Sequence, residues 1–359
     1  FPVTAPYLML FQSDFWERIY HLPSWTYYAW CLQEPADHLK AYRQMEELLP
    51  FDIAQPNQWA SNREERRYLR IVEGEDGNWY QENTRTGVRV KLELNLHEKD
   101  RESEWERIIF SKDEVDDKIP VSNADEIFEK GHLDYLAAYQ KAWGHERFVT
   151  GTMVNSFYTS SHYVGLTNRF ILLMEEPELM HAIIERLTMR NIEEARAMAK
   201  AGCDAIFIDD ATATNDMVSV RVYDEFCKPY LKRQVEEIHR LGMKAILIYF
   251  GGIADRVENI VGVGADALLM ETSMKGFTND LEQIARKVNN RMLLFGNLNP
   301  LDDLERATDE ELIARMKAQI AIGKRYGRFV VSTGSPITPD TSLERVQNYI
   351  RWAHELSAF

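Results

Sequence analysis

The segment "KAILIYFGGI", residues 244–253, has the composition of a buried strand that runs into a glycine turn. It is one of eight aliphatic or β-branched runs, at 3–10, 51–54, 147–152, 204–209, 244–249, 266–271, 292–297 and 328–333. Amphipathic helical stretches separate the later runs, such as residues 176–202, which end at Gly202. The alternation predicts a parallel sheet, and eight units favour a closed (β/α)8 TIM barrel over an open doubly wound sheet.

One region interrupts this alternation. Residues 68–94 carry turn signals around Glu75 to Asn78 and around Thr86 and Gly87, with alternating apolar and polar residues between them. We expect an antiparallel insertion after the second strand, spanning residues 57–120 within a single barrel domain of residues 1–359. Because βα loops project from the C-terminal face of a barrel, it is expected to form a lid or a partner surface at the mouth. A peripheral ornament is the alternative.

The composition limits the partners of the chain. Of its 359 residues 45% are hydrophobic and 28% charged, and no apolar run approaches the roughly 20 residues needed to span a bilayer. A net charge of -15 argues against nucleic acid and anionic membranes, and favours a small-molecule substrate or a protein partner. A homodimer is compatible with the sequence. The chain begins with Phe1 instead of methionine, so we expect a preceding segment.

The three cysteines, Cys31, Cys203 and Cys227, are widely separated and form no CxxC motif. Such spacing is typical of a reducing compartment and not of a disulfide framework. We therefore expect a cytoplasmic protein.

Polar residues follow the predicted strands and are expected to share the mouth of the barrel. The catalytic candidates are Asp209, Asp210, Tyr249 and Glu271, and the substrate-binding candidates are His162, Asn297, Asn299 and Ser335. Carboxylates arranged around such a ring can bind a divalent metal, hold a cationic substrate or transfer a proton, and Glu271 with Asp209 is the expected metal pair. Their mutual repulsion should raise the pKa of at least one carboxylate.

Several candidates also have a structural interpretation. Asp209 or Asp210 could cap the next helix through its N–H groups, and Tyr249 and Asn297 could be plain barrel packing. His162 could face solvent. Glu271 directly follows the apolar run "ALLM", where a buried charge needs a partner.

Three stretches carry a resemblance to a known family: residues 201–253, "FGNLNP" at 295–300 and "VVSTGSPITPDTSLERVQNYI" at 330–350. In order and spacing they resemble the uroporphyrinogen decarboxylase superfamily over roughly residues 140–355, and within it most of all the methylcobalamin:coenzyme M methyltransferase branch. The resemblance implies a (β/α) barrel with its site in the mouth, in agreement with the strand pattern.

The resemblance does not extend to the metal ligands. The methyltransferase branch binds zinc through a His-x-Cys pair and a later Cys, and these positions hold Ile248, Phe250 and Ser335 here. Uroporphyrinogen decarboxylases have a His at the position of Ser335 and an arginine-rich N-terminal segment, whereas residues 5–25 contain only Arg18. An acidic mouth would also repel the carboxylates of a porphyrinogen.

Three functions remain open. The resemblance implies a methyltransferase that moves a methyl group between a small methylated compound and a corrinoid protein, with zinc or another metal on oxygen or imidazole ligands as Lewis acid. The alternative is a cofactor-free decarboxylase of a small acid, in which Asp209 or Asp210 stabilises a cationic intermediate and Tyr249 supplies a proton. The third is a non-catalytic binding protein whose carboxylates diverge or pair with neighbours such as Arg256.

Overall fold

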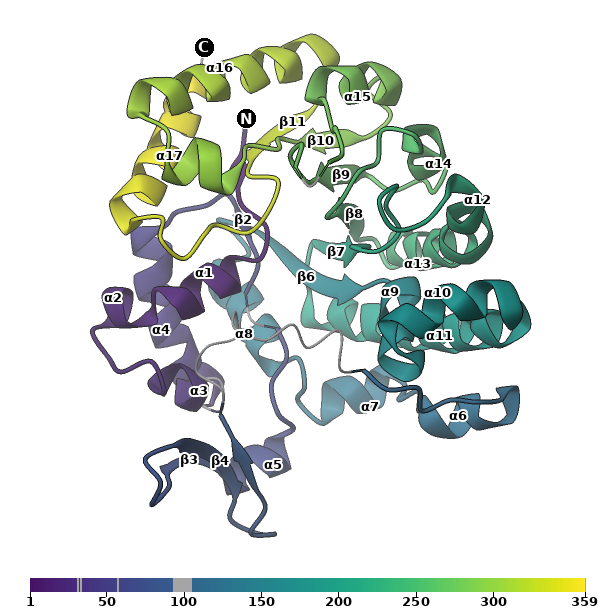
Figure 1. Cartoon of the computed structure of the whole chain (residues 1–359). Coiled ribbons are helices and arrows are strands. Elements are labelled where there is room, and N and C mark those ends of the chain that lie inside the picture. The colour runs from purple at the N-terminus through teal and green to yellow at the C-terminus, as the bar shows by residue number, and fades with distance from the viewer. Residues whose placement is uncertain (31, 33, 57, 93–104, 275, 359) are drawn as a thin grey trace.

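A ring of parallel strands forms the centre of the molecule. The computed structural model describes residues 1–30, 32, 34–56, 58–92, 105–274 and 276–358. Eight strands pair in the order β1-β11-β10-β9-β8-β7-β6-β2 and curve into a nearly closed barrel surrounded by helices (Figure 1). They are β1 (Val3–Thr4), β2 (Ile53–Ala54), β6 (Phe148–Val154), β7 (Ala205–Asp209), β8 (Lys244–Tyr249), β9 (Ala267–Met270), β10 (Leu293–Phe295) and β11 (Phe329–Ser332). Each overlaps a predicted strand, so the (β/α)8 prediction is confirmed.

Helices connect these strands. In the described residues they are α1 (Leu8–Asp14), α2 (Trp16–Tyr20), α3 (Thr26–Trp30), α4 (Pro35–Leu48), α5 (Arg63–Tyr68), α6 (Val115–Lys118), α7 (Ala124–Glu129), α8 (Asp134–Trp143), α9 (Ser156–Val164), α10 (Leu166–Glu175), α11 (Pro177–Ala201), α12 (Val220–Val222), α13 (Lys228–Arg240), α14 (Val257–Val261), α15 (Leu281–Val288), α16 (Asp309–Tyr326) and α17 (Leu343–Ser357), with short 3-10 or π turns η2 (Lys112–Glu114), η3 (Tyr223–Cys227) and η4 (Pro300–Glu305). As predicted, α11 ends at Gly202, whose φ of 86° suits a residue without a Cβ. None of the described helices is both long and apolar enough to cross a membrane.

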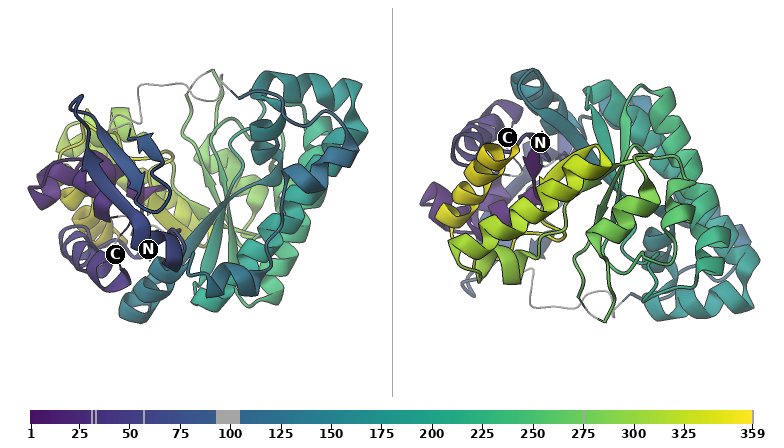
Figure 2. Two further views of the ribbon diagram at one scale, coloured as in Figure 1. Left: turned by 90° about the horizontal axis from the view of Figure 1, so that it is seen from below. Right: turned by 90° about the horizontal axis from the view of Figure 1, so that it is seen from above.

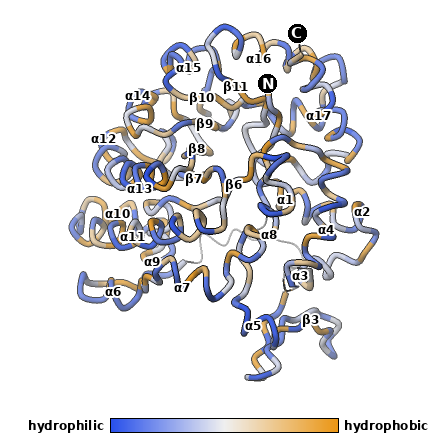
Figure 3. Tube along the Cα trace, turned by 180° about the vertical axis from the view of Figure 1, so that it is seen from behind, coloured by the Kyte–Doolittle hydropathy of each residue, from blue (hydrophilic) through white to orange (hydrophobic). Residues whose placement is uncertain are grey.

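The core has two layers, one on each face of the barrel wall. The interior cluster consists of Ile53, Ala205, Phe207, Ile246, Ile248, Ala267, Leu269, Phe295 and Val330. Residues of the opposite strand face, among them Ile206, Leu247 and Met270, belong to the larger cluster that packs against the helices. Hydrophobic residues follow the strands while the helices mix hydrophobic and hydrophilic turns (Figure 3), as expected for strands buried on both faces.

The barrel closes between its two shortest strands. No ladder joins β1 and β2, yet the backbone N–H of Asp52 donates to the carbonyl of Val3 at 3.1 Å. The carboxylate of Asp52 accepts from the backbone N–H of Val3 at 2.7 Å, and Thr4 Oγ1 donates to the carbonyl of Ile53. We call this junction the β1/β2 seam.

The insertion after the second strand is a three-stranded antiparallel sheet. It consists of β3 (Leu69–Glu73), β4 (Trp79–Asn83) and β5 (Arg89–Lys91), in the order β3-β4-β5, and it projects beside the purple N-terminal helices (Figures 1 and 2). The ring of Trp79 stacks on Trp25, which precedes α3, with centroids 4.1 Å apart. The antiparallel insertion is therefore confirmed. Its role as a lid or partner surface stays a prediction, and residues 57 and 93–104 of the predicted range 57–120 lie outside the described residues.

Candidate active site

At the ends of β7, β8 and β9, successive side chains point to opposite faces of the barrel wall. In the parallel register Asp209 pairs with Ile248 and Ile248 with Leu269, and the latter two belong to the interior cluster. Asp209 therefore faces the interior, as do Phe250 and Glu271, two residues beyond Ile248 and Leu269. Glu271 lies two strands away from Asp209 and two residues beyond the position level with it. Strand spacing and rise per residue therefore place the two backbones about 12 Å apart, with both side chains directed to the interior.

Tyr7 is the residue that meets Asp209. It follows β1, and its hydroxyl donates a short hydrogen bond to Asp209 Oδ2. Its backbone is left-handed, with φ 54° and ψ 48°, which is uncommon for a residue with a side chain and is often found at functional sites. Gln55 holds this conformation, because its Oε1 accepts from the N–H of Tyr7 at 2.9 Å. Sequence reasoning missed Tyr7, since its partner lies 202 residues away.

The environment of Tyr7 favours its protonated form. Burial raises the pKa of its phenol well above the usual range, and the Asp209 charge and hydrogen bond raise it further. Tyr158 on α9 is close enough to add to the same effect, and the ring of Phe250 lies 5.8 Å from that of Tyr7. The pair can therefore hold and transfer a proton at the mouth.

Asp210 and Tyr249 lie on the other face of the wall. Tyr249 belongs to the cluster that packs against the helices, and its hydroxyl is 2.8 Å from that of Tyr223 in η3. Asp210 is fully buried, and its N–H donates to the carbonyl of Ile248 at 2.9 Å. This corrects the expectation that both point into the mouth: side chains alternate along a strand, so the residues next to Asp209 and Ile248 turn outward.

Asp210 is a fully buried carboxylate. Asn155, Arg169 and Arg256 are close enough to influence it. Burial raises its pKa to about 7; Asn155 lowers it, the Asp209 charge raises it, and Arg169 and Arg256 lower it. The expected rise in the pKa of one carboxylate is thus present, but burial contributes more than repulsion between carboxylates.

Neither aspartate caps a helix. The next helix, α12, begins at Val220, and Ser219 caps it by accepting from the N–H of Val222. Fully buried Arg256 holds the loop between Asp210 and α12, because its guanidinium donates to the carbonyls of Ala213 and Val218 at 2.9 and 2.7 Å. Arg256 forms its ion pair with Asp255, so it serves the loop more than the site carboxylates.

Glu271 and Ser335 are brought together as a pair. Ser335 Oγ donates to Glu271 Oε1 at 3.1 Å, and Glu271 is only 3% exposed. The loop after β11 approaches closely here, because a Cβ on Gly334 would lie 2.6 Å from the N atom of Thr272 and 2.9 Å from the carbonyl oxygen of Met270. Glycine at 334 is therefore what permits this contact.

The remaining predicted substrate residues have structural partners. Asn297 donates to the carbonyl of Asn279 at 3.0 Å and accepts from Gln319 at 3.2 Å. Asn299 is the N-cap of η4 and accepts from the N–H groups of Leu301 and Asp302, so its side chain is committed to the backbone. His162 is exposed, with its ring 3.9 Å from that of Trp105. Their substrate roles stay predictions.

The residues present do not fit a catalytic zinc ion. Within the described part of the chain, no three His, Cys, Asp or Glu side chains gather closely enough to hold a metal. Cys203 and Cys227 are buried, and burial raises the pKa of the Cys203 thiol to about 12; Cys31 lies outside the described residues. The expected pair of Glu271 and Asp209 therefore lacks a third ligand of these types, and we derive no step through a metal.

A cavity of about 400 Å³ opens next to Tyr7. We call it the side pocket, and its walls include Tyr7, Trp59, Met153, His162, Arg190 and Glu194. The side pocket lies beside the part of β6 that extends beyond its short partner strand β2. There the side-chain amide of Gln58 accepts a hydrogen bond from the N–H of Thr152 at 2.6 Å, where a longer β2 would pair. A volume of this size suits a small molecule.

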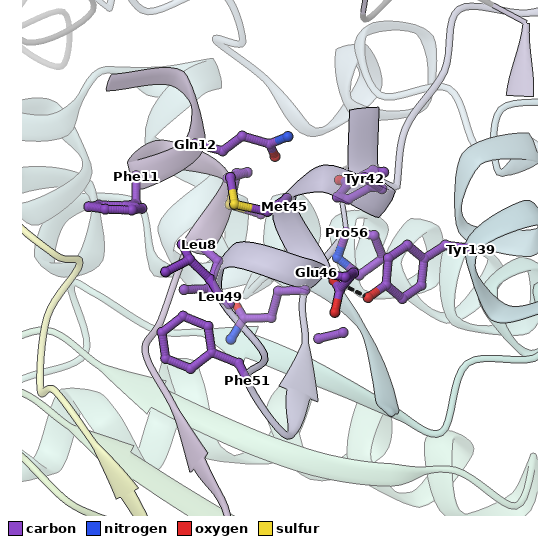
Figure 4. A pocket seen from close by; sticks show the side chains of 13 residues that line it. Leu8, Phe11, Gln12, Tyr42, Met45, Glu46, Leu49, Phe51, Pro56 and Tyr139 are labelled. Carbon is purple, nitrogen blue, oxygen red and sulfur yellow. Dashed lines mark hydrogen bonds between the residues drawn. The ribbon is translucent and has the colours of Figure 1, made fainter. Parts of the chain in front are cut away.

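Two other cavities offer less chemistry. One of about 350 Å³ lies at the opposite end of the barrel, where Ile53, Ile246 and Phe295 contribute to its apolar lining. The other, of about 30 Å³, lies between α1 and α4, where the carboxylate of Glu46 accepts from Tyr139 (Figure 4). Its volume is about that of one water molecule. Of these three cavities, the side pocket is the one of substrate size that Tyr7 lines.

Fold and site together define an α/β barrel protein with its candidate active site at the C-terminal ends of the strands. Residues 89–356 match the model of the family described as uroporphyrinogen decarboxylase (URO-D), and the chain belongs to this family. The resemblance deduced from the sequence is thereby confirmed. The family includes decarboxylases and methyltransferases, so the chain is related to enzymes of both kinds.

The individual relatives share about a quarter to a third of their residues with this chain over the matched segments. A uroporphyrinogen decarboxylase of Coxiella burnetii is 31% identical over 183 residues, which cover 49% of this chain and 47% of that protein. The methylcobamide:CoM methyltransferase MtbA of Methanosarcina mazei is 25% identical over 215 residues, 60% of this chain and 61% of that protein. The chain thus spans about half to three fifths of these relatives. A solved methyltransferase from Methanosarcina mazei covers 90% of this chain and 86% of its own with a TM-score of 0.63, but at 18% identity it shows the fold alone.

Proposed function

We propose that the protein is a methyltransferase in which the Tyr7–Asp209 pair gives a proton to the heteroatom that loses its methyl group. The observation that carries the proposal is the hydrogen bond from Tyr7 to Asp209 at the inner face of the mouth. It joins a phenol held protonated to a carboxylate beside a cavity of substrate size. The name of the MtbA relative supports methyl transfer to or from a corrinoid.

The step balances as a proton relay. The bond between the methyl carbon and the heteroatom breaks, its electron pair stays on the heteroatom, and the methyl group passes to a nucleophilic acceptor. We propose that this acceptor is a corrinoid carried by a partner protein. Tyr7 protonates the heteroatom while protonated Asp209 reprotonates Tyr7, which leaves the phenol donating to the carboxylate. Solvent then returns a proton to Asp209.

Glu271 supplies a negative charge to the same mouth. Its side chain is nearly buried and fixed by Ser335, so the charge is preorganised and weakly screened. Such a carboxylate favours the positive charge that a protonated methyl ether carries before its C–O bond breaks. A methyl ether is therefore the expected donor, because its oxygen needs a proton to leave, whereas a quaternary amine leaves without one.

The test uses free reduced cobalamin as the methyl acceptor. The protein is incubated with 2-methoxyphenol, dimethyl sulfide or a tetramethylammonium salt, and methylcobalamin is followed by its absorbance. We expect transfer from the ether and a loss of about 100-fold or more in the rate for Tyr7→Phe. Tyr326→Phe is the matched control, because this hydroxyl contacts Arg286 and Glu282 on the outer helices. Equal rates in Tyr7→Phe and wild type, or no transfer from any donor, would overturn the proposal.

A decarboxylase is the second candidate, and the absence of a metal-ligand set among the described residues favours it. A small acid would lose CO₂, and the electron pair left on carbon would take the proton from the same Tyr7–Asp209 pair. The two functions differ in product. CO₂ released from small carboxylic acids without cobalamin, and slowed by Tyr7→Phe, would replace methyl transfer as the assignment.

A further inference from the structure

The lining of the side pocket contains a charged pair on α11 that the proposed reaction does not use. Arg190 and Glu194, one turn apart on α11, both line the cavity. Arg190 Nε lies 3.7 Å from Glu194 Oε1, which is an ion-pair distance but too long for a hydrogen bond. Arg190 Nη1 donates to Tyr163 Oη at 3.0 Å, which holds the guanidinium in place. About a quarter of each side chain stays exposed.

Arg190 and Glu194 favour ligand groups of opposite charge. Burial raises the pKa of the Glu194 carboxyl above its usual range, while Arg190 lowers it. A carboxylate bound here would face Glu194, and an ammonium group would face Arg190. A neutral hydroxyl avoids both repulsions, because its oxygen accepts from the guanidinium while its proton is donated to the carboxyl group. The pair therefore selects for an uncharged group that both donates and accepts.

Other parts of the pocket lining suit a flat apolar ligand. Trp59 is 39% exposed and lines the cavity with Met9 and Met153. Aromatic rings and thioethers pack well against aromatic guests. Because Tyr7 and the α11 pair line the same cavity, one molecule bound there can contact both.

We infer that the substrate is a small flat molecule with an uncharged hydroxyl separate from its reacting group, and that this hydroxyl binds between Arg190 and Glu194. The reacting end rests on the proposed function, whereas the hydroxyl end rests on the α11 pair alone. The two parts are therefore tested by separate measurements.

The experiment compares three probes with the same ring: benzyl alcohol, benzoate and benzylammonium. Their dissociation constants are measured by ligand-observed NMR on the full chain, without turnover. We expect benzyl alcohol to bind about tenfold more tightly than either ion, and Arg190→Gln and Glu194→Gln each to weaken it about tenfold. Arg286→Gln is the matched control, because Arg286 forms the same kind of i,i+4 pair with Glu282 on α15 and should leave binding unchanged.

Several outcomes would overturn the inference. Benzoate or benzylammonium binding as tightly as benzyl alcohol, no binding of any probe, or binding unchanged in both α11 variants would each do so. Melting temperatures are recorded beside the binding data, and a variant that melts early is replaced by Glu194→Met or Arg190→Met, which keep the apolar stem. Methyl transfer that depends on Tyr7 would still support the proposed function if the hydroxyl site were overturned in this way. Conversely, the expected probe pattern without methyl transfer would leave the hydroxyl site intact and remove only the proposed reaction.

Discussion

The inner and outer faces of the barrel wall differ sharply at the ends of β7 and β8, although consecutive residues form them. On the inner face Asp209 meets Tyr7 beside the substrate-sized side pocket. On the outer face Asp210 is fully buried, and Tyr249 meets Tyr223. The proposed reaction uses the first carboxylate, whereas the second is buried against the helices. Two consecutive residues of a strand thus point to opposite faces of the wall and have different surroundings.

The largest expected effect is on the inner face. Asp209→Asn removes the carboxyl group that reprotonates Tyr7, so we expect the rate of methyl transfer from 2-methoxyphenol to fall about 100-fold or more. Asp210→Asn should lower it far less, because no substrate reaches that side chain. Initial rates of methylcobalamin formation for the two variants decide the matter. Equal losses would abolish the distinction between the faces.

The next effect concerns the stability contributed by the outer face. The pKa of Asp210 is about 7 in the folded protein against 3.8 ordinarily. Between these values the folded chain binds the extra proton, so stability falls as the pH rises through this window and levels off above it. Asn cannot titrate. The unfolding free energy of Asp210→Asn relative to wild type should therefore rise by about 2 kcal/mol from pH 5 to pH 8.

Urea titrations of both proteins at the two pH values measure this difference. Asp209→Asn is the control on the inner face, because Asp209 lies beside Tyr7 at the mouth, whereas Asp210 is buried behind the wall. A relative stability of Asp210→Asn that does not change with pH would mean that its carboxyl group is already ionised throughout, with solvent or an ion beside it.

The smallest effect concerns the tyrosine pair on the outer face. Tyr249→Phe leaves the buried hydroxyl of Tyr223 without the partner that lies 2.8 Å away, which should cost about 1 kcal/mol of stability. Turnover should stay within about twofold of wild type, because the hydroxyl faces the helices. A shift in the urea midpoint together with an unchanged rate would sharpen the comparison. A tenfold loss of rate would return Tyr249 to the reaction.

The strands were predictable because their signals are local. Runs of Val, Ile and Leu punctuated by glycine or polar residues identified all eight barrel strands, and turn residues located the insertion, which has three strands. The face that each strand end presents was not predictable to the same degree. It depends on which residue of the run enters the interior, and that is fixed by the register between strands. Hence the strand ends could be predicted, whereas the interior face of Asp209 and the outer face of Tyr249 follow from the register.

Three further differences between the prediction and the structure concern Tyr7, Asn299 and the Glu271–Ser335 contact. Tyr7 owes its position to a left-handed backbone and to a partner on another strand, neither of which leaves a local pattern. Asn299, by contrast, could have been read as a cap, because Asn followed by Pro300 is a common start of a helical turn. The Glu271–Ser335 contact depends on the close approach at Gly334, which only the folded barrel reveals.

The β1/β2 seam has a consequence for how the chain matures. β1 is held by β11, by the seam contacts and by the hydroxyl of Tyr349 on α17, which donates to the carbonyl of Thr4. Tyr7 lies three residues beyond Thr4, so its position beside Asp209 depends on elements that are far apart in the sequence. We therefore expect the Tyr7–Asp209 contact to form late in folding, when β1 docks between β2 and β11 and the barrel closes. Mutations that loosen this junction are expected to disturb the pair without touching either of its members.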